Sequence, residues 1–317
     1  MKEKISIIIP SYNNKSFLAQ AVHSALQQSE TGEVIVVDDA STDGSLELAL
    51  SLAAEDHRVK LIRQWPNAGA GAARNRGIEA AAFPWISFLD ADDYFLPNRF
   101  QALFRTFRQD PHLDGGYDAI VHHVEAPGLT RDDLLNIGEA TTDIRAFHSI
   151  PPEQLFSALL FQPRFWIPMV GLTVRKSFLD QYQIRFDPSL RYTEDTDFIY
   201  RCVLKGRFSG SGASRALIVR RIHSHNSVRD HPTVWQQQRA AFFQKWRQEI
   251  LHHDWPAAIN RYFVKSWLQH HPLAQPVLHL AFLRYSFKAI LLTALLIRYP
   301  SLIRKCSFNQ SQPYKGH

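Results

Sequence analysis

The segment EVIVVDDASTDGSLELALSLAAED, residues 33–56, contains one complete strand-and-helix unit. It begins with a continuous run of apolar, mostly β-branched residues, which is typical of a strand covered on both faces. Asp38 and Asp39 stand where that strand ends, and an apolar, helix-forming stretch follows. A buried strand, a polar break and then a helix is the building block of an α/β fold.

The same unit recurs on both sides of this segment. The alternation is carried by ISIII (5–9), KSFLAQAVHSALQQ (15–28), VKLIRQ (59–64), GAARNRGIEAA (71–81) and PWISFLD (84–90). Such alternation favours parallel pairing with right-handed crossovers, and therefore a doubly wound, mostly parallel sheet. Ligands bind beyond the carboxyl ends of the strands in these sheets, where this chain places PSYN, Asp38–Asp39 and Asp90–Asp93.

The pattern changes beyond residue 100. VGLTVRKSFLDQY (170–182) predicts a strand that enters a helix, an acidic start at 194 precedes a helical stripe, and 216–222 predicts another strand. Residues 111–155 give no clear assignment. We therefore expect two halves of one domain, 1–100 and 101–230, followed by a helical extension, 231–317.

Composition limits the possible classes of protein. The chain has 317 residues, of which 45% are hydrophobic, as in ordinary globular proteins. Its two cysteines, Cys202 and Cys306, form no CxxC pattern, which argues against a disulfide framework and a thiolate zinc site. A predicted strand begins after four residues and leaves no room for a signal peptide, so we expect a cytoplasmic protein.

Five aspartates, Asp38, Asp39, Asp90, Asp92 and Asp93, should meet at one edge of the sheet. Carboxylates this close repel one another unless they are protonated or neutralised by cations. Oxygen ligands favour Mg²⁺ or Mn²⁺ over zinc. Alternatively, Asp92 and Asp93 only cap the following segment and face water.

The segment NAGAGAARNRG (67–77) resembles an anion-binding helix start. Gly69 and Gly71 allow backbone N–H groups to approach an anion, and Arg74 and Arg76 add positive charge. It does not fit a dinucleotide fingerprint, because Arg74 stands at the third glycine position. The alternative is that the glycines serve close helix packing.

Five motifs occur in order: SIIIPSYNN, EVIVVDDASTDGS, NAGAGAARNRGI, WISFLDADD and YTEDTDF. Together they resemble the family 2 glycosyltransferases of GT-A fold, over residues 5 to about 230. The resemblance implies that 1–100 is a nucleotide-sugar-binding half and 101–230 an acceptor-binding half. It implies a donor site of Pro10, Tyr12, Asp39, Asn67, Gly69, Arg74 and Asp90. The family's DxD motif corresponds here to Asp90-Ala91-Asp92, and the resemblance implies that Asp92 binds the metal and that Asp93 is a supporting acid.

The pair Glu194–Asp195 resembles the family's ED motif, in which the aspartate is usually the catalytic base. A sugar hydroxyl needs such a base because it is a poor nucleophile until it loses its proton. Acids are also favoured at any helix N-terminus, which is the alternative for Glu194, Asp195 and Asp197. His223 matches a histidine that approaches the metal in many members, and His225 would share its face on a strand.

The resemblance implies an inverting transfer from a UDP-sugar to a saccharide or lipid-linked hydroxyl, with Mn²⁺ or Mg²⁺, in surface polysaccharide or glycolipid synthesis. We expect no nucleic-acid partner. Two alternatives stay open. A metal-dependent nucleotidyltransferase usually has a glycine-rich basic loop after its first strand, whereas PSYNNKS has no glycine. A non-catalytic sugar-binding protein would not need both acidic clusters.

The C-terminal segment is basic. Residues 255–317 contain no Asp or Glu and eight Lys or Arg, so the net charge of +6 arises there. AILLTALLI (289–297) is too short to span a bilayer, which takes ~20 residues. Arg284, Lys288 and Arg298 share one side of a predicted helix, which favours peripheral binding to an anionic membrane on its cytoplasmic face. Packing as an accessory helical bundle is the alternative.

Overall fold

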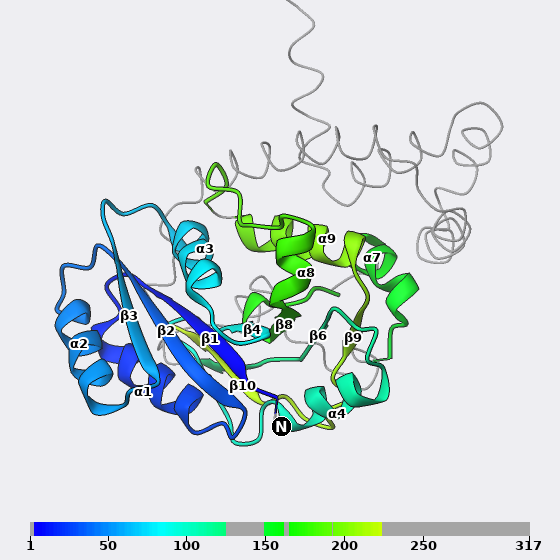
Figure 1. Cartoon of the computed structure of the whole chain (residues 1–317), viewed down its shortest axis with the longest axis horizontal. Helices are drawn as coiled ribbons and strands as arrows, with labels where there is room; N and C mark the ends of the chain where they lie inside the picture. The colour runs from blue at the N-terminus through cyan, green and yellow to red at the C-terminus, as the bar shows by residue number, and fades with distance from the viewer. Residues whose placement is uncertain (1–2, 125–148, 162–164, 192, 224–317) are drawn as a thin grey trace, which may run out of the picture. The chain divides into compact units, whose positions relative to one another are not determined.

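Strands and helices alternate through the first ninety residues as the sequence predicts (Figure 1). The computed structural model describes residues 3–124, 149–161, 165–191 and 193–223. The strands are β1 (Ile5–Ser11), β2 (Thr31–Asp39), β3 (Val59–Gln64), β4 (Trp85–Phe88), β5 (Tyr94–Phe95), β6 (Gly115–Tyr117), β7 (Val121–Val124), β8 (Leu172–Arg175), β9 (Phe208–Gly210) and β10 (Ile218–Ile222). The helices are α1 (Lys15–Leu26), α2 (Ser45–Glu55), α3 (Ala70–Ala80), α4 (Gln101–Gln109), α7 (Pro152–Phe161), α8 (Lys176–Gln181) and α9 (Glu194–Lys205), with a 3-10 helix η1 at Met169–Gly171.

The main sheet has the order β3-β2-β1-β4-β8-β6-β9. All its neighbouring strands are parallel except those of β8, which runs antiparallel to both β4 and β6. The expected α/β fold with a mostly parallel sheet is therefore confirmed. The strand expected at 216–222 is β10, but it belongs to a second, smaller sheet of order β5-β10-β7.

The two faces of β1 show why the sheet is covered on both sides. Ile5, Ile7 and Ile9 belong to one buried cluster with residues of α1 and α2, because alternate strand residues face the same side. Ile8 faces the other side, where α3 lies over β1 (Figure 1). A Cβ placed on Gly77 of α3 would stand only 2.4 Å from Cγ2 of Ile8, so glycine permits this close approach.

Aromatic packing continues the core into the second half of the domain. Trp85 of β4 stacks on Phe107 of α4 with centroids 4.0 Å apart, and the guanidinium of Arg175 lies over the Trp85 ring at 4.2 Å. On the opposite face, Phe88 packs edge-on against Phe198 of α9. The core thus joins the halves predicted at 1–100 and 101–230.

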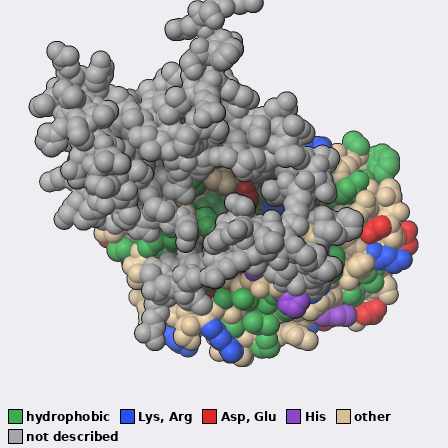
Figure 2. Space-filling model, turned by 180° about the vertical axis from the view of Figure 1, so that it is seen from behind, with side chains coloured by type: hydrophobic (Ala, Val, Ile, Leu, Met, Phe, Trp, Pro, Cys, Tyr) green, Lys and Arg blue, Asp and Glu red, His purple; other side chains and the backbone are tan. Residues whose placement is uncertain are grey.

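The predicted extension 231–317, together with His225 and the basic helix, lies outside the described residues. Among the described residues, no helix combines the length and the apolar character that crossing a membrane requires. The described part of the face in Figure 2 mixes acidic, basic, histidine and apolar side chains.

Candidate active site

A pocket of about 650 Å³ opens beyond the carboxyl ends of β1, β2 and β4. Ten of the eleven residues proposed from sequence line it. They are Pro10, Tyr12, Asp39, Gly69, Arg74, Asp90, Asp92, Glu194, Asp195 and His223. The eleventh, Asn67, supports the loop below it, as described next.

Asp39 organises the loop that precedes α3. Its Oδ1 accepts hydrogen bonds from Gln64 Nε2 (2.6 Å) and the Ala68 N–H (2.8 Å), and its Oδ2 accepts one from the Gly69 N–H (2.8 Å). The Asn67 side chain donates to the Asp39 carbonyl at 2.9 Å. Gly69 has φ +90° and ψ 165°, a conformation that is essentially restricted to glycine. Since a carboxylate oxygen has two acceptor sites, Oδ2 of Asp39 can accept a second bond.

The end of β1 forms another wall of the pocket. Asn13 is left-handed at φ 54°, and its Oδ1 accepts the Thr42 N–H at 2.8 Å, which ties this turn to the loop after β2. Tyr12 beside it is 50% exposed. The ring therefore offers a flat apolar surface at the pocket, suited to stacking on a planar group.

The three acids after β4 have different surroundings. Asp90 is the most open, with 36% of its side chain exposed, and Asp92 is at 22%. Asp93 is buried, and its Oδ1 accepts the Arg221 N–H at 2.9 Å. Burial, together with the carboxylates of Asp92 and Asp90, raises the pKa of Asp93 well above its ordinary value. Asp93 therefore fixes the acidic loop to β10, while Asp90 and Asp92 face the pocket.

Asp92 pairs with His223 at the end of β10. Nε2 of His223 lies 3.0 Å from Oδ2 of Asp92, and the imidazole stacks on Phe17 with centroids 4.9 Å apart. Arg221, two residues earlier, lies 5.0 Å from the centroids of both Phe17 and Tyr94. Strand β10 therefore brings a histidine, its neighbouring arginine and the acidic loop together.

Arg74 of α3 bridges the two acidic clusters. Its Nη2 lies 2.7 Å from Asp90 Oδ1 and its Nη1 lies 3.3 Å from Glu194 Oε1, with the side chain almost fully buried. Burial alone would lower the pKa of Arg74, but Asp90 and Glu194 raise it. Arg76, expected to add charge at the same place, instead donates to the Arg63 carbonyl at 3.2 Å and does not line the pocket.

The acids in the first turn of α9 separate into different roles. Glu194 is buried, and burial and then Asp195 raise its pKa to about 8, against the opposing effect of Arg74. Asp195 is half-buried and lines the pocket, and its Oδ1 accepts the Thr196 N–H at 2.6 Å. Asp197 is fully buried in an ion pair with Arg201 at 2.7 Å, so its role is in packing. Asp195 is therefore the acid of this turn best placed to act on a ligand.

Sequence reasoning missed three arginines that line the pocket, Arg191, Arg220 and Arg221, and also Phe17. Strand residues two apart face the same side, so the placement of Arg221 could have been inferred from that of His223. Arg191 lies three residues before Glu194 and carried no periodic signal. Phe17 gave only the signal of a core residue in a helix.

The chemistry of Asp92 and His223 fits a divalent cation. Two adjacent ligands of an octahedral ion with bonds of ~2.1 Å stand about 3 Å apart, which matches the 3.0 Å between these two atoms. Mg²⁺ commonly uses one or two protein carboxylates and completes its shell with water and substrate phosphates. In the part of the chain that the structure describes, no group of three His, Cys, Asp or Glu side chains is positioned to hold a metal.

The sequence is similar to known glycosyltransferases. Residues 6–159 match Glycosyl transferase family 2. The chain is 32% identical over 211 residues to the succinoglycan biosynthesis protein ExoU of Rhizobium meliloti. The aligned region covers 64% of this chain but only 57% of ExoU. The chain thus spans little more than half the length of that relative. An uncharacterized glycosyltransferase of Nostoc sp. is 30% identical over 244 residues, covering 75% of this chain and 70% of the relative.

The fold is similar to that of solved enzymes. The structure of S. aureus TarS 1-349 in complex with UDP-GlcNAc superimposes with a TM-score of 0.61 at 21% identity, covering 84% of this chain and 72% of that chain. At this identity the likeness concerns the fold, which is of the GT-A type. With the Nostoc relative covered over most of its length, the expected family is confirmed: this chain belongs to glycosyl transferase family 2.

Proposed function

We propose that this chain is an inverting glycosyltransferase that moves a sugar from a UDP-sugar to a hydroxyl of a saccharide or lipid-linked acceptor. One observation carries the proposal: the acids that follow β2 and β4 and the acids that begin α9 line the same pocket. The UDP-GlcNAc complex of TarS supports a UDP-sugar donor. The name of ExoU supports a role in polysaccharide biosynthesis. Family membership disfavours a nucleotidyltransferase or a non-catalytic protein.

The donor half of the pocket is built for a nucleotide diphosphate. The base lies against Pro10 and Tyr12 and bonds to Asp39, whose Oδ2 has an acceptor site left. Arg74 and the backbone at Gly69 lie on the side where the phosphates need positive charge. Asp90 is held by Arg74 and is open enough to accept from a ribose hydroxyl.

Asp195 acts as the general base. As the acceptor oxygen bonds to the anomeric carbon, its proton passes to the Asp195 carboxylate, and the bond from that carbon to the diphosphate oxygen breaks on the opposite side. One displacement inverts the configuration and releases UDP. Glu194, whose pKa is raised to about 8, holds its own proton at neutral pH and does not compete for the proton of the acceptor hydroxyl.

We also propose that Asp92 and His223 hold Mn²⁺ or Mg²⁺. Such an ion, when bound, neutralises the charge that develops on the leaving diphosphate. Asp93 and Arg221 keep the acidic loop and β10 together. For the acid-free tail we propose cytoplasmic, peripheral attachment to an anionic membrane; it lies outside the described residues.

Nucleotide release tests the function. The full chain is incubated with Mn²⁺, a mixture of saccharide and polyprenyl-phosphate-linked acceptors, and separate UDP-, GDP- and CMP-sugars, with Asp195→Asn as the control. We expect UDP to appear only with a UDP-sugar and the unsubstituted chain. Release of GDP or CMP alone would show that the donor is wrong. If no nucleotide appeared and calorimetry showed no binding of UDP, the proposed function would be overturned.

A further inference from the structure

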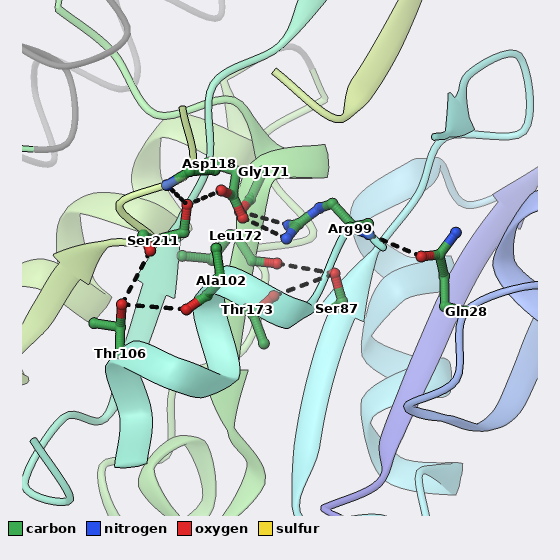
Figure 3. Close-up of polar contacts among 11 residues, drawn as sticks. Gln28, Ser87, Arg99, Ala102, Thr106, Asp118, Gly171, Leu172, Thr173 and Ser211 are labelled. Carbon is green, nitrogen blue, oxygen red and sulfur yellow. Dashed lines mark hydrogen bonds and ion pairs between the residues drawn. The ribbon is translucent and has the colours of Figure 1, made fainter. Parts of the chain in front are cut away.

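A cluster of buried polar side chains lies outside the pocket, among the segments that join the two sheets (Figure 3). Arg99 lies after β5, Asp118 follows β6 and Ser211 follows β9, and the three residues are 0%, 4% and 2% exposed. Nη1 of Arg99 donates to one oxygen of the Asp118 carboxylate, and the Ser211 hydroxyl donates to the other. We call these residues the Arg99–Asp118–Ser211 cluster.

Further bonds tie the cluster to the main domain (Figure 3). Nη2 of Arg99 donates to the Gly171 carbonyl in η1 at 3.1 Å, and the Arg99 N–H donates to Gln28 Oε1 after α1 at 2.9 Å. The Ser211 carbonyl accepts from Thr106 Oγ1 of α4 at 3.0 Å. Five segments of the chain, after α1, after β5, after β6, at η1 and after β9, are therefore fixed at one point.

Stability alone does not account for a fully buried ion pair. Burial lowers the pKa of Arg99, and Asp118 opposes this, so the pair survives against a desolvation cost. Apolar replacements of buried ion pairs are often no less stable, and the better-attested use of such pairs is to select one arrangement among several.

The small sheet is the part of the domain that needs such selection. Its strands β5, β10 and β7 have only two, five and four residues and come from distant parts of the chain. Strands this short depend on packing against the rest of the domain for their position. Each strand lies close in sequence to the cluster: Phe95 is four residues before Arg99, Asp118 is three before Val121, and Ser211 is seven before Ile218.

The position of β10 matters because this strand carries residues of the pocket. The Arg221 N–H donates to Asp93 at 2.9 Å, and His223 lies 3.0 Å from Asp92. We propose that the Arg99–Asp118–Ser211 cluster is a positioning device that holds β10 in the register that brings Arg221 to Asp93 and His223 to Asp92. The consequence for catalysis rests on the proposed function, whereas the placement of β10 does not.

Hydrogen–deuterium exchange tests the placement directly. The variants are Asp118→Asn and the milder Ser211→Ala, in the full chain. The matched control is Glu33→Gln. Glu33 is also buried and accepts hydrogen bonds from Ser6 Oγ (2.5 Å) and the Ala82 N–H (2.7 Å), but it lies near the end of β2 that is away from the pocket. We expect amides of 218–222 to exchange about tenfold faster or more in both cluster variants, with β1 unchanged and with no such effect in the control.

Kinetics provides the second readout. With the UDP-sugar that the chain accepts, Ser211→Ala should lower kcat by about tenfold with a donor KM within about twofold, since the nucleotide side of the pocket is untouched. Arg99→Lys keeps the charge but loses the bond to Gly171. Its kcat should therefore lie between that of Ser211→Ala and that of the unsubstituted chain.

The outcomes separate the two proposals. If exchange at 218–222 stays unchanged in Ser211→Ala, or rises equally in β1 and β10, the cluster is a core ion pair and the positioning role is overturned. If Asp118→Asn does not fold, Ser211→Ala decides the matter. If exchange rises at 218–222 but the unsubstituted chain turns over no donor, the positioning role stands and the proposed function fails.

Discussion

Asp195 and Glu194 are adjacent in sequence but differ in what surrounds them. Asp195 lines the pocket, whereas Glu194 is buried against Arg74. We expect Asp195→Asn to lower kcat by about 100-fold or more with little change in donor KM, because an amide cannot accept the acceptor's proton. UDP release at saturating donor measures this. If Glu194→Gln lowered kcat more than Asp195→Asn did, Glu194 would be the base and Asp195 the supporting acid.

Glu194 should also make stability depend on pH. Its pKa is raised from 4.5 to about 8, so between these values the folded chain keeps a proton that the unfolded chain releases. The free energy of unfolding therefore falls as pH rises from about 4.5 to 8, with a slope on the order of 1 kcal/mol per pH unit. Glu194→Gln should flatten this slope in urea unfolding at pH 5, 6.5 and 8. The exposed Glu47→Gln is the control, and parallel curves for Glu194→Gln and the unsubstituted chain would refute the assignment.

Asp92 should be needed for metal binding as well as for turnover. Because the carboxylate is partly open and lies at a strand end, Asp92→Ala should leave the fold intact while abolishing transfer and its dependence on a divalent ion. Titration of free Mn²⁺ by electron paramagnetic resonance measures binding without substrate, with Asp180→Asn on α8 as control. Unaltered Mn²⁺ affinity in Asp92→Ala, or activity that survives chelation, would exclude the proposed ligand.

At the scale of elements, the contact of α3 with β1 depends on glycine. A Cβ at Gly77 would overlap Ile8, so we expect Gly77→Ala to destabilise the fold by about 1–3 kcal/mol, more than the gain of up to ~1 kcal/mol in helix propensity. Urea unfolding of both single variants and of the double variant with Ile8→Ala measures the coupling. In the double variant Gly77→Ala should become neutral or stabilising. Additive effects would mean that helix and strand do not meet at this point.

The elements that sequence could predict are the long and regular ones. Strands β1, β2 and β4 contain buried apolar runs because helices cover both faces, whereas the edge strand β3, VKLIRQ, mixes apolar and charged residues. Helices α1 to α3 follow β1 to β3 after polar breaks. By contrast, β6 is GGY and β9 is FSG, each too short for a period and rich in glycine. Their pairing, like the antiparallel direction of β8 between β4 and β6, had no local signal in the sequence.

The site was predictable where short motifs follow strands. Asp39, Asp90 and Asp92 stand at strand ends, and parallel strands bring those ends to one edge. The bridge from Arg74 to Glu194 was not predictable, because it joins residues 120 positions apart. Nor was the placement of Arg220 in the pocket, because alternation along a strand assigns it to the face opposite Arg221 and His223.

At the scale of the whole molecule, the basic tail makes a prediction that lies outside the described residues. Each Lys or Arg near an anionic membrane is worth ~1 kcal/mol, and salt screens the attraction. We expect the full chain to co-sediment with phosphatidylserine-containing vesicles at low salt and less at high salt. The triple substitution Arg284→Glu, Lys288→Glu and Arg298→Glu should weaken this binding by at least tenfold. If both chains stayed in the supernatant, packing as an accessory bundle would be favoured.

The antiparallel strand β8 has a consequence for synthesis on the ribosome. β4 needs β8 as its outer neighbour, yet β8 begins 84 residues after Phe88 and the pocket's His223 follows Phe88 by 135 residues. At ~5–20 residues per second, the first residue of β8 is made about 4 to 17 s after Phe88, and the histidine about 7 to 27 s after it. Until β8 is made, WISF presents an unpaired strand edge, the kind of edge on which chains pair wrongly. The length of the segment between β4 and β8 therefore sets how long this strand edge stays unpaired during translation.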